Sequence, residues 1–240
     1  MYDVNVQGVC KKFGSVYAVK HINFFVKKGE ILGFLGQNGA GKTTTIKMLT
    51  GQLLPTEGYI EIFGMNITDH HKDIMSKIGY IPDTPILYEG LTPKEMLGFI
   101  GRLYNMKTSV LSNRIHELLS IMNLKDFEDE LIKNFSLGMK KKVSIACGLI
   151  HSPKLLILDE VTNGLDPRSA REIKDLIKVL NEQQGISCLL TTHILDVVEE
   201  LAHRIIIIEK GEIIEQGELV ELKEKYKEKN LEGVFLKAIS

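Results

Sequence analysis

The chain has 240 residues, of which 44% are hydrophobic and 25% are charged. These fractions are ordinary for a folded globular protein and exclude a disordered chain or a collagen-like repeat. Its 30 basic and 31 acidic residues give a net charge of −1. A nucleic-acid-binding protein is typically strongly basic, so we expect no nucleic-acid partner.

The cysteine pattern indicates a reducing compartment, and the hydropathy pattern indicates a chain without a membrane-spanning helix. Three cysteines stand far apart without a CxxC pattern, which indicates buried thiols and not a disulfide framework. The longest purely aliphatic runs, 155–158 and 205–208, have four residues each, whereas a membrane-spanning helix needs about 20. The first residues lack the apolar segment of a secretory signal. We therefore expect a cytoplasmic chain that does not cross a bilayer by itself.

The first third of the chain predicts strands and one helix. Short alternating or aliphatic segments predict strands over 4–9, 21–26, 31–35, 58–64 and 77–82. A helix is expected from Lys42 until Gly51 ends it.

The middle of the chain, from about 85 to 150, has a different pattern. Apolar residues recur there at three- and four-residue spacing, which predicts helices. The first helix opens with Thr92 and Glu95 in capping-box spacing and Pro93 at its first position. We interpret this stretch as an inserted helical lobe.

Strand–helix alternation returns after residue 150. Strands are predicted over 155–158 and 187–192, helices over 166–184 and 194–202, and a hairpin over 204–216. The tail, 218–230, predicts one charged surface helix.

The most specific motif is the segment 36–43, GQNGAGKT, which fits the phosphate-binding pattern G-x-x-x-x-G-K-[ST]. It lies between a predicted strand and a predicted helix, as that motif requires. Glycines let backbone N–H groups face phosphate oxygens, and the helix N-terminus adds positive charge. Lys42 can reach the β- and γ-phosphates, and the Thr43 hydroxyl can bind Mg²⁺. The expected binding residues are Gly36, Gln37, Asn38, Gly39, Ala40, Gly41, Lys42, Thr43 and Thr44.

A second motif supplies groups for hydrolysis. The aliphatic strand 155–158 ends in Asp159 and Glu160. We expect Asp159 to hold the Mg²⁺ shell and Glu160 to polarise the attacking water as general base. His193, at the end of another strand, is expected near the γ-phosphate. The predicted catalytic residues are thus Lys42, Glu160 and His193.

Together these motifs resemble the ATP-binding subunit of an ABC (ATP-binding cassette) transporter. The phosphate loop, LLILDE, the GLD at 164–166 and the following TTH all fit that family, and the resemblance covers about residues 2–220. The family signature corresponds to 135–140, FSLGMK, which begins 20 residues before Leu155. Its form resembles the drug and antibiotic exporter branch, and also some lipid or polysaccharide exporters.

The resemblance implies an α/β fold of the P-loop NTPase type. We expect a mostly parallel core sheet, an N-terminal antiparallel β portion and the helical lobe, all in one domain over 1–240. The ATP-binding core would comprise about 1–84 and 151–220, the lobe about 85–150, and the tail about 218–240.

The resemblance also implies roles for five further residues. Phe13 matches the aromatic residue that stacks on adenine, with Tyr17 as a rival. Asp83 stands where most relatives carry glutamine, a residue that meets Mg²⁺ or the attacking water. Ser136 and Gly138 match signature residues that act on the ATP of a second subunit, and Asp166 would cross the same dimer interface.

The function implied is Mg²⁺-dependent ATP hydrolysis that drives a separate integral membrane permease, in the direction of export. The ATPase would form a dimer with a second ATP-binding subunit, with two ATP molecules between the chains, on the cytoplasmic face of the membrane. One alternative is a soluble ABC ATPase without a transport role, such as the iron–sulfur assembly type. Another is a nucleotide-binding regulator without turnover, which the intact motif residues disfavour.

Overall fold

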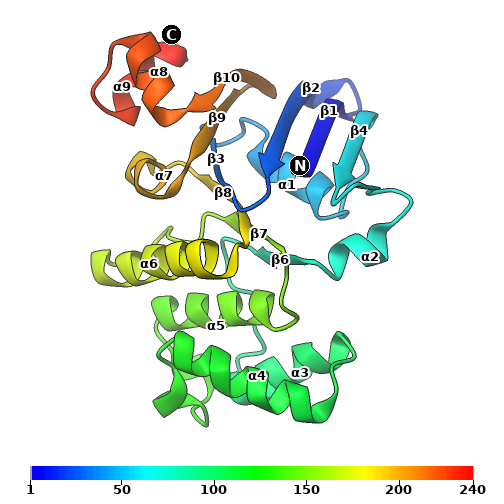
Figure 1. Ribbon diagram of the computed structural model, residues 1–240, viewed down its shortest axis with the longest axis vertical. Coiled ribbons are helices and arrows are strands. Elements are labelled where there is room, and N and C mark those ends of the chain that lie inside the picture. Colours follow the sequence, from blue (N-terminus) through cyan, green and yellow to red (C-terminus); the bar gives the residue numbers. More distant parts are fainter. Residues whose placement is uncertain (1, 240) are drawn as a thin grey trace.

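The computed structural model describes residues 2–239 and shows an α/β fold (Figure 1). Its first half contains β1 (Tyr2–Phe13), β2 (Val16–Lys27), β3 (Ile31–Leu35), α1 (Lys42–Leu49), β4 (Glu57–Ile62), β5 (Met65–Asn66), α2 (His71–Met75), β6 (Ile78–Ile81), α3 (Pro93–Leu103) and α4 (Thr108–Ile121). After two short 3₁₀ turns, Lys125–Phe127 and Ile132–Asn134, follow α5 (Leu137–Leu149), β7 (Leu155–Asp159), α6 (Pro167–Gln184), β8 (Ser187–Thr192), α7 (Leu195–Leu201), β9 (Arg204–Glu209), β10 (Glu212–Glu218), α8 (Leu219–Tyr226) and α9 (Leu231–Ala238).

The central sheet has the strand order β10-β9-β3-β8-β7-β6. Its neighbours pair in parallel except β9 and β10, which form the antiparallel hairpin expected from the sequence. Both faces are buried, since alternate residues of β7 belong to two different hydrophobic clusters: Leu155 and Ile157 to one, Leu156 and Leu158 to the other. Burial on both faces explains why this strand reads as a continuous aliphatic run.

The second sheet is antiparallel, with the order β2-β1-β4-β5. It packs over α1 and one face of the central sheet through residues such as Val6, Phe24 and Ile60. Its first two strands have 12 residues each and are longer than the sequence pattern predicted, because register shifts interrupt the alternation. The mostly parallel core sheet and the antiparallel N-terminal portion are both confirmed.

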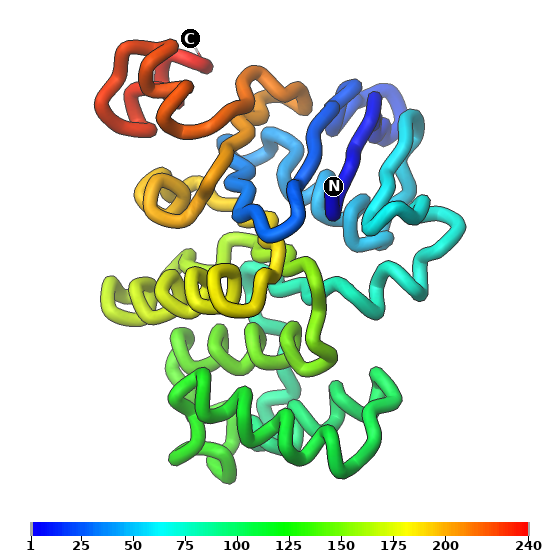
Figure 2. The backbone as a smooth tube through the Cα atoms, viewed as in Figure 1, coloured from blue at the N-terminus to red at the C-terminus, as the bar shows by residue number. Residues whose placement is uncertain are grey.

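Helices α3, α4 and α5 lie together at the end of the molecule opposite the C-terminal helices (Figures 1 and 2). All three fall within the predicted lobe. The capping box is confirmed: the Thr92 N–H donates to Glu95 Oε2 at 2.9 Å, and the Glu95 N–H donates to Thr92 Oγ1 at 3.2 Å.

The C-terminal tail differs from the single surface helix that its charge pattern predicted. The chain ends α8 at Tyr226, with Lys227 in a left-handed conformation (φ 54°), and then forms α9. Leu231 and Val234 of α9 are fully buried against the core. Across residues 2–239, no helix has the length and apolar character needed to span a membrane.

Candidate active site

Three loops meet at the carboxyl ends of adjacent parallel strands and enclose a cavity of about 340 Å³. The loop after β3 carries the glycine-rich motif, β7 ends at Asp159 and is followed by Glu160, and β8 is followed by His193. In open α/β sheets this edge is where ligands bind. The cavity is lined by Ala18, Gln37, Asn38, Gly39, Gly41, Lys42, Thr43, Thr44, Asp83, Asp159, Glu160, Asn163 and His193.

The glycine-rich loop wraps tightly against its surroundings. Gly41 precedes α1 with φ 113°, a conformation that L-residues rarely adopt. A Cβ atom at Gly36 would lie 2.5 Å from the Ile208 carbonyl oxygen, so a side chain there would push the loop off β9. Gln37, Asn38 and Gly39 are exposed. The loop therefore offers its backbone and the α1 N-terminus to an anion.

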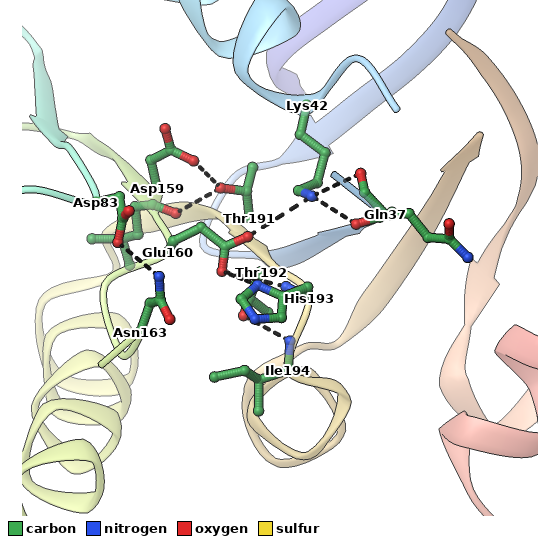
Figure 3. A network of polar contacts seen from close by, with 12 residues as sticks. Gln37, Lys42, Asp83, Asp159, Glu160, Asn163, Thr191, Thr192, His193 and Ile194 are labelled. Atoms are coloured by element: carbon green, nitrogen blue, oxygen red, sulfur yellow. Dashed lines mark hydrogen bonds and ion pairs between the residues drawn. The ribbon is translucent and has the colours of Figure 1, made fainter. Parts of the chain in front are cut away.

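Lys42 turns back over this loop. Its Nζ donates to the carbonyl oxygens of Gly36 at 2.6 Å and Gln37 at 3.3 Å. It also lies 3.8 Å from Glu160 Oε1, so the ammonium joins the phosphate loop to the end of β7 (Figure 3). The side chain is only 7% exposed, which places a strongly held positive charge where phosphates would sit.

Glu160 is held by its backbone as well as its side chain. It is a non-glycine residue with φ 51°, and its N–H donates to the Thr191 carbonyl at 3.0 Å. Its Oε2 accepts hydrogen bonds from the His193 backbone N–H at 3.4 Å and from the His193 ring Nδ1 at 2.9 Å (Figure 3). The carboxylate is thus directed toward Lys42 and His193 at the cavity.

Oxygen donors suited to Mg²⁺ lie in the same cavity. Thr43, Asp83 and Asp159 all line it, and hydroxyl and carboxylate oxygens are the ligands that this ion prefers. Burial raises the pKa of Asp159, and the nearby Glu160 and Asp83 carboxylates add to this, against the hydrogen bond from Thr191 and the charge of Lys42. A cation beside Asp159 would relieve that cost, so the residues fit the ion.

Asp83 follows β6 and approaches the loop after β7. Its Oδ1 accepts a hydrogen bond from Asn163 Nδ2 at 3.4 Å (Figure 3) and lies 3.6 Å from Lys141 Nζ. Lys141 comes from α5 and its side chain is 3% exposed. The structure therefore brings Asp83 to the site and gives it a positive partner.

Apart from Asp83, the residues implied by the family resemblance do not line this cavity. Phe13, at the end of β1, is 51% exposed and has Lys11 Nζ 5.4 Å from its ring centre; its rival Tyr17 is 37% exposed. Ser136 caps α5 by accepting from the Met139 N–H at 3.3 Å.

Two more predicted residues stand at the α5–α6 contact. Gly138 allows close approach, since a Cβ atom there would lie 2.8 Å from Ser169 Oγ on α6. Asp166 caps α6, with Oδ1 accepting from the N–H groups of Arg168 and Ser169 at 3.0 Å each. A hydrogen bond from the Ser169 side chain is the largest cause of the lowered pKa of Asp166, and these backbone hydrogen bonds add to it.

Three polar residues at the site were missed in the sequence: Thr191, Lys141 and Asn163, which lines the cavity. Thr191 donates its hydroxyl to Asp159 Oδ1 at 2.6 Å, and its place in the strand before His193 was the available signal. Lys141 stands in a run of three lysines, which offered nothing to distinguish it from its neighbours.

The fold and this site define a P-loop nucleotide hydrolase. The family described as ABC transporter matches residues 19–163, and the chain belongs to that family. The bacitracin transport ATP-binding protein BcrA of Bacillus licheniformis is 41% identical over 222 residues, which are 92% of this chain and 72% of that protein.

Solved structures agree with this assignment. An ATP-binding subunit of an ABC transporter has a TM-score of 0.89 at 29% identity, over 99% of both chains. The dimeric ATP-binding cassette MJ0796, in a post-hydrolysis state with ADP and Pi, has a TM-score of 0.81 at 28% identity, over 90% of this chain and 98% of that one. This chain is therefore an ATP-binding, ATP-hydrolysing subunit of the ABC transporter type.

Proposed function

We propose that this chain powers a separate membrane permease that exports its substrate, and that it works on the cytoplasmic face of the membrane through that permease. The observation that carries the proposal is the placement of the Glu160 carboxylate between Lys42 and His193 at the nucleotide cavity. The export direction is supported by the likeness to a bacitracin transport protein and by the FSLGMK form of the signature.

The chemistry is attack of water on the γ-phosphorus of ATP, giving ADP and phosphate. Glu160 would accept a proton from the attacking water. Lys42, which can move from its loop carbonyls to phosphate oxygens, would stabilise the negative charge of the transferring group, and His193 would contact the same group from the end of β8. Thr43 and Asp159 would hold Mg²⁺, and the ion would supply additional neutralisation of the phosphate charge.

We propose that two copies of the chain form the active dimer. Ser136 and Gly138 lie at the α5 N-terminus, where free N–H groups and the helix dipole favour an anion. They do not line this chain's own cavity, which is consistent with action on the ATP of the partner subunit. Asp166, exposed at the start of α6, would lie at the same interface.

The docking surface for the permease is proposed to be an apolar groove of about 460 Å³ between β6, α3 and α5. Its rim carries Ile86, which is 80% exposed, and Leu103, which is 64% exposed. Large exposed apolar side chains beside a groove are typical of protein–protein contacts. The groove also includes Pro82, next to Asp83, so its occupant would act directly beside the catalytic cavity.

An affinity purification from detergent-solubilised native membranes tests this proposal. The tagged chain should bring down a stoichiometric polytopic membrane protein, identified by mass spectrometry, and ATP hydrolysis should be measurable in the complex. Recovery of soluble partners alone would favour the non-transport ABC ATPase instead. Absence of hydrolysis in both the free chain and the complex would favour the regulator.

A further inference from the structure

Lys141 is a buried lysine with a set of partners different from those of its neighbours on α5. Its Nζ donates to the carbonyl oxygens of Asn163 at 2.8 Å and Glu160 at 3.0 Å, and it lies 3.6 Å from Asp83 Oδ1. Burial lowers the pKa of Lys141, and the Asp83 and Glu160 carboxylates oppose that change. Because an unpaired buried ammonium is costly, these contacts are what keep the side chain in place.

The contact with Glu160 falls on a strained part of the backbone. A non-glycine residue in the left-handed region is strained and persists only where its surroundings hold it. At Glu160 (φ 51°) the N–H is held by the Thr191 carbonyl, and the carbonyl oxygen is held by Lys141 and by the Asn163 N–H. Lys141 therefore contributes to the conformation that points the Glu160 carboxylate toward His193.

Asp83 completes this arrangement from a third segment. It follows β6, Lys141 lies on α5, and Glu160 and Asn163 follow β7. The Lys141 ammonium thus contacts two segments outside its own helix, one after β6 and one after β7. A displacement of α5 relative to β7 would draw the ammonium away from the Glu160 carbonyl.

We propose that Lys141 is a positioning residue for ATP hydrolysis, which holds Glu160 in its productive conformation, and that Asp83 serves as its counter-ion. This inference rests on the proposed function of Glu160 as general base. It assigns to Asp83 a charge partner within the chain. It also gives α5, the helix that begins at the signature, a direct contact with the catalytic loop.

The test compares Lys141→Met with Lys142→Met. Methionine keeps an unbranched stem and removes the donor and the charge. Lys142 lies on the same helix and pairs with Glu172 of α6 at 2.6 Å, so its variant controls for the loss of one α5 lysine. We expect Lys141→Met to lower kcat about 10- to 100-fold, because small misplacement of a catalytic group is enough for such losses. Affinity for a fluorescent ATP analogue should change less than about twofold in both variants, because Lys141 does not touch the phosphate loop. Lys142→Met should also keep the wild-type kcat.

A kcat within about twofold of wild type in Lys141→Met, in a chain that hydrolyses ATP, would overturn the inference and leave the proposed function intact. Absence of hydrolysis in the wild-type chain would instead count against the proposed function. If circular dichroism shows that Lys141→Met is unfolded, Lys141→Gln takes its place, since its amide retains N–H donors. Its crystal structure would show whether the amide reaches the Glu160 carbonyl. A wild-type kcat in Lys141→Gln is expected only if the amide reaches that carbonyl, and a wild-type kcat without this contact overturns the inference.

Asp83→Asn tests the counter-ion. Because Asp83 is proposed to act through Lys141, the double variant with Lys141→Met should lose no more kcat than Lys141→Met alone. Additive losses, accompanied by a raised Mg²⁺ requirement in Asp83→Asn, would assign Asp83 to the metal and overturn its role as counter-ion.

Discussion

The ring Nδ1 of His193 lies 2.9 Å from Oε2 of Glu160, across the ends of β8 and β7. A carboxylate only accepts hydrogen bonds, so Nδ1 donates, and Nε2 is the ring nitrogen left for another contact. The His193 side chain is 47% exposed, whereas that of Glu160 is 12% exposed. The pair therefore combines a fixed carboxylate with a ring that remains accessible from the cavity.

This relationship predicts the behaviour of Glu160→Gln. The amide keeps the shape of the side chain but is a far weaker base, so kcat should fall about 10²- to 10⁴-fold. ATP affinity should be almost unchanged, because Lys42 and the phosphate loop remain. Steady-state hydrolysis and binding of a fluorescent ATP analogue measure the two effects.

The same variant reports on assembly. If ATP joins two chains, blocked hydrolysis should leave a dimer that light scattering detects only with ATP present. Wild-type turnover in Glu160→Gln would remove this residue from the role of general base, whereas a monomer at saturating ATP would count against the proposed dimer alone.

The sequence predicted those parts of the site that are local in the chain. The phosphate loop, Asp159 with Glu160, and His193 each follow a strand directly, and parallel strands bring their carboxyl ends to one edge. The Asp83–Lys141 pair could not be predicted in this way, because its members lie 58 positions apart and neither motif indicates the other.

Two features of the backbone were also hidden from pattern analysis. The left-handed conformation of Glu160 depends on Thr191 and Lys141, which reach it from other segments. Helix α9 begins at Leu231, after the end of the predicted tail helix at 230, and its eight residues are too few for periodicity to identify a helix. In both cases tertiary contacts, absent from the local sequence, determine the outcome.

If the permease docks in the groove between β6, α3 and α5, substitutions in the groove should impair permease binding and leave ATP hydrolysis unchanged. Replacing both Ile86 and Leu103 by Asp should reduce co-purification of the permease at least about tenfold, since burying each side chain contributes about 1.5–3 kcal/mol. Basal ATP hydrolysis by the free chain should stay within about twofold of wild type, because neither residue lines the nucleotide cavity.

Leu54→Asp is the matched control for that experiment. Leu54 is 60% exposed but does not line the groove, so its variant should recover the permease normally. Unreduced co-purification in the Ile86 and Leu103 double variant would place the permease contact elsewhere on the surface.

A buried ion pair links Arg204, at the start of β9 in the central sheet, to Glu30, which directly precedes β3. Arg204 Nη1 lies 3.2 Å from Glu30 Oε1, with side chains 8% and 6% exposed, and its Nη2 donates to the Phe25 carbonyl at 3.2 Å. Arg204→Met should lower the free energy of unfolding by about 3–5 kcal/mol, because it leaves the Glu30 carboxylate buried without its partner. Urea denaturation measures this loss.

The double variant Glu30→Gln with Arg204→Met should recover part of that stability, because no charge is then left unpaired. A double variant no more stable than Arg204→Met would show that the lost packing of the arginine on Phe25, whose ring centre is 4.1 Å away, matters more than the unpaired charge.

His151 predicts a pH dependence of stability. Its Nε2 donates to the Ile78 carbonyl at 2.9 Å, and its ring stacks on Tyr104 with 4.0 Å between ring centres. Burial lowers the pKa of His151; the nearby Arg114 adds to this, and the hydrogen bond with Ile78 opposes it.

As the pH falls below about 6.5, the unfolded chain therefore takes up the His151 proton before the folded chain does. The folded state loses stability until the pH reaches the lowered pKa. Urea denaturation at pH values of about 8 and 5.5 should show a larger loss for wild type than for His151→Gln, which lacks this titrating group and keeps the other six histidines. Equal losses in the two proteins would mean that His151 takes up its proton equally well in the folded and unfolded chain.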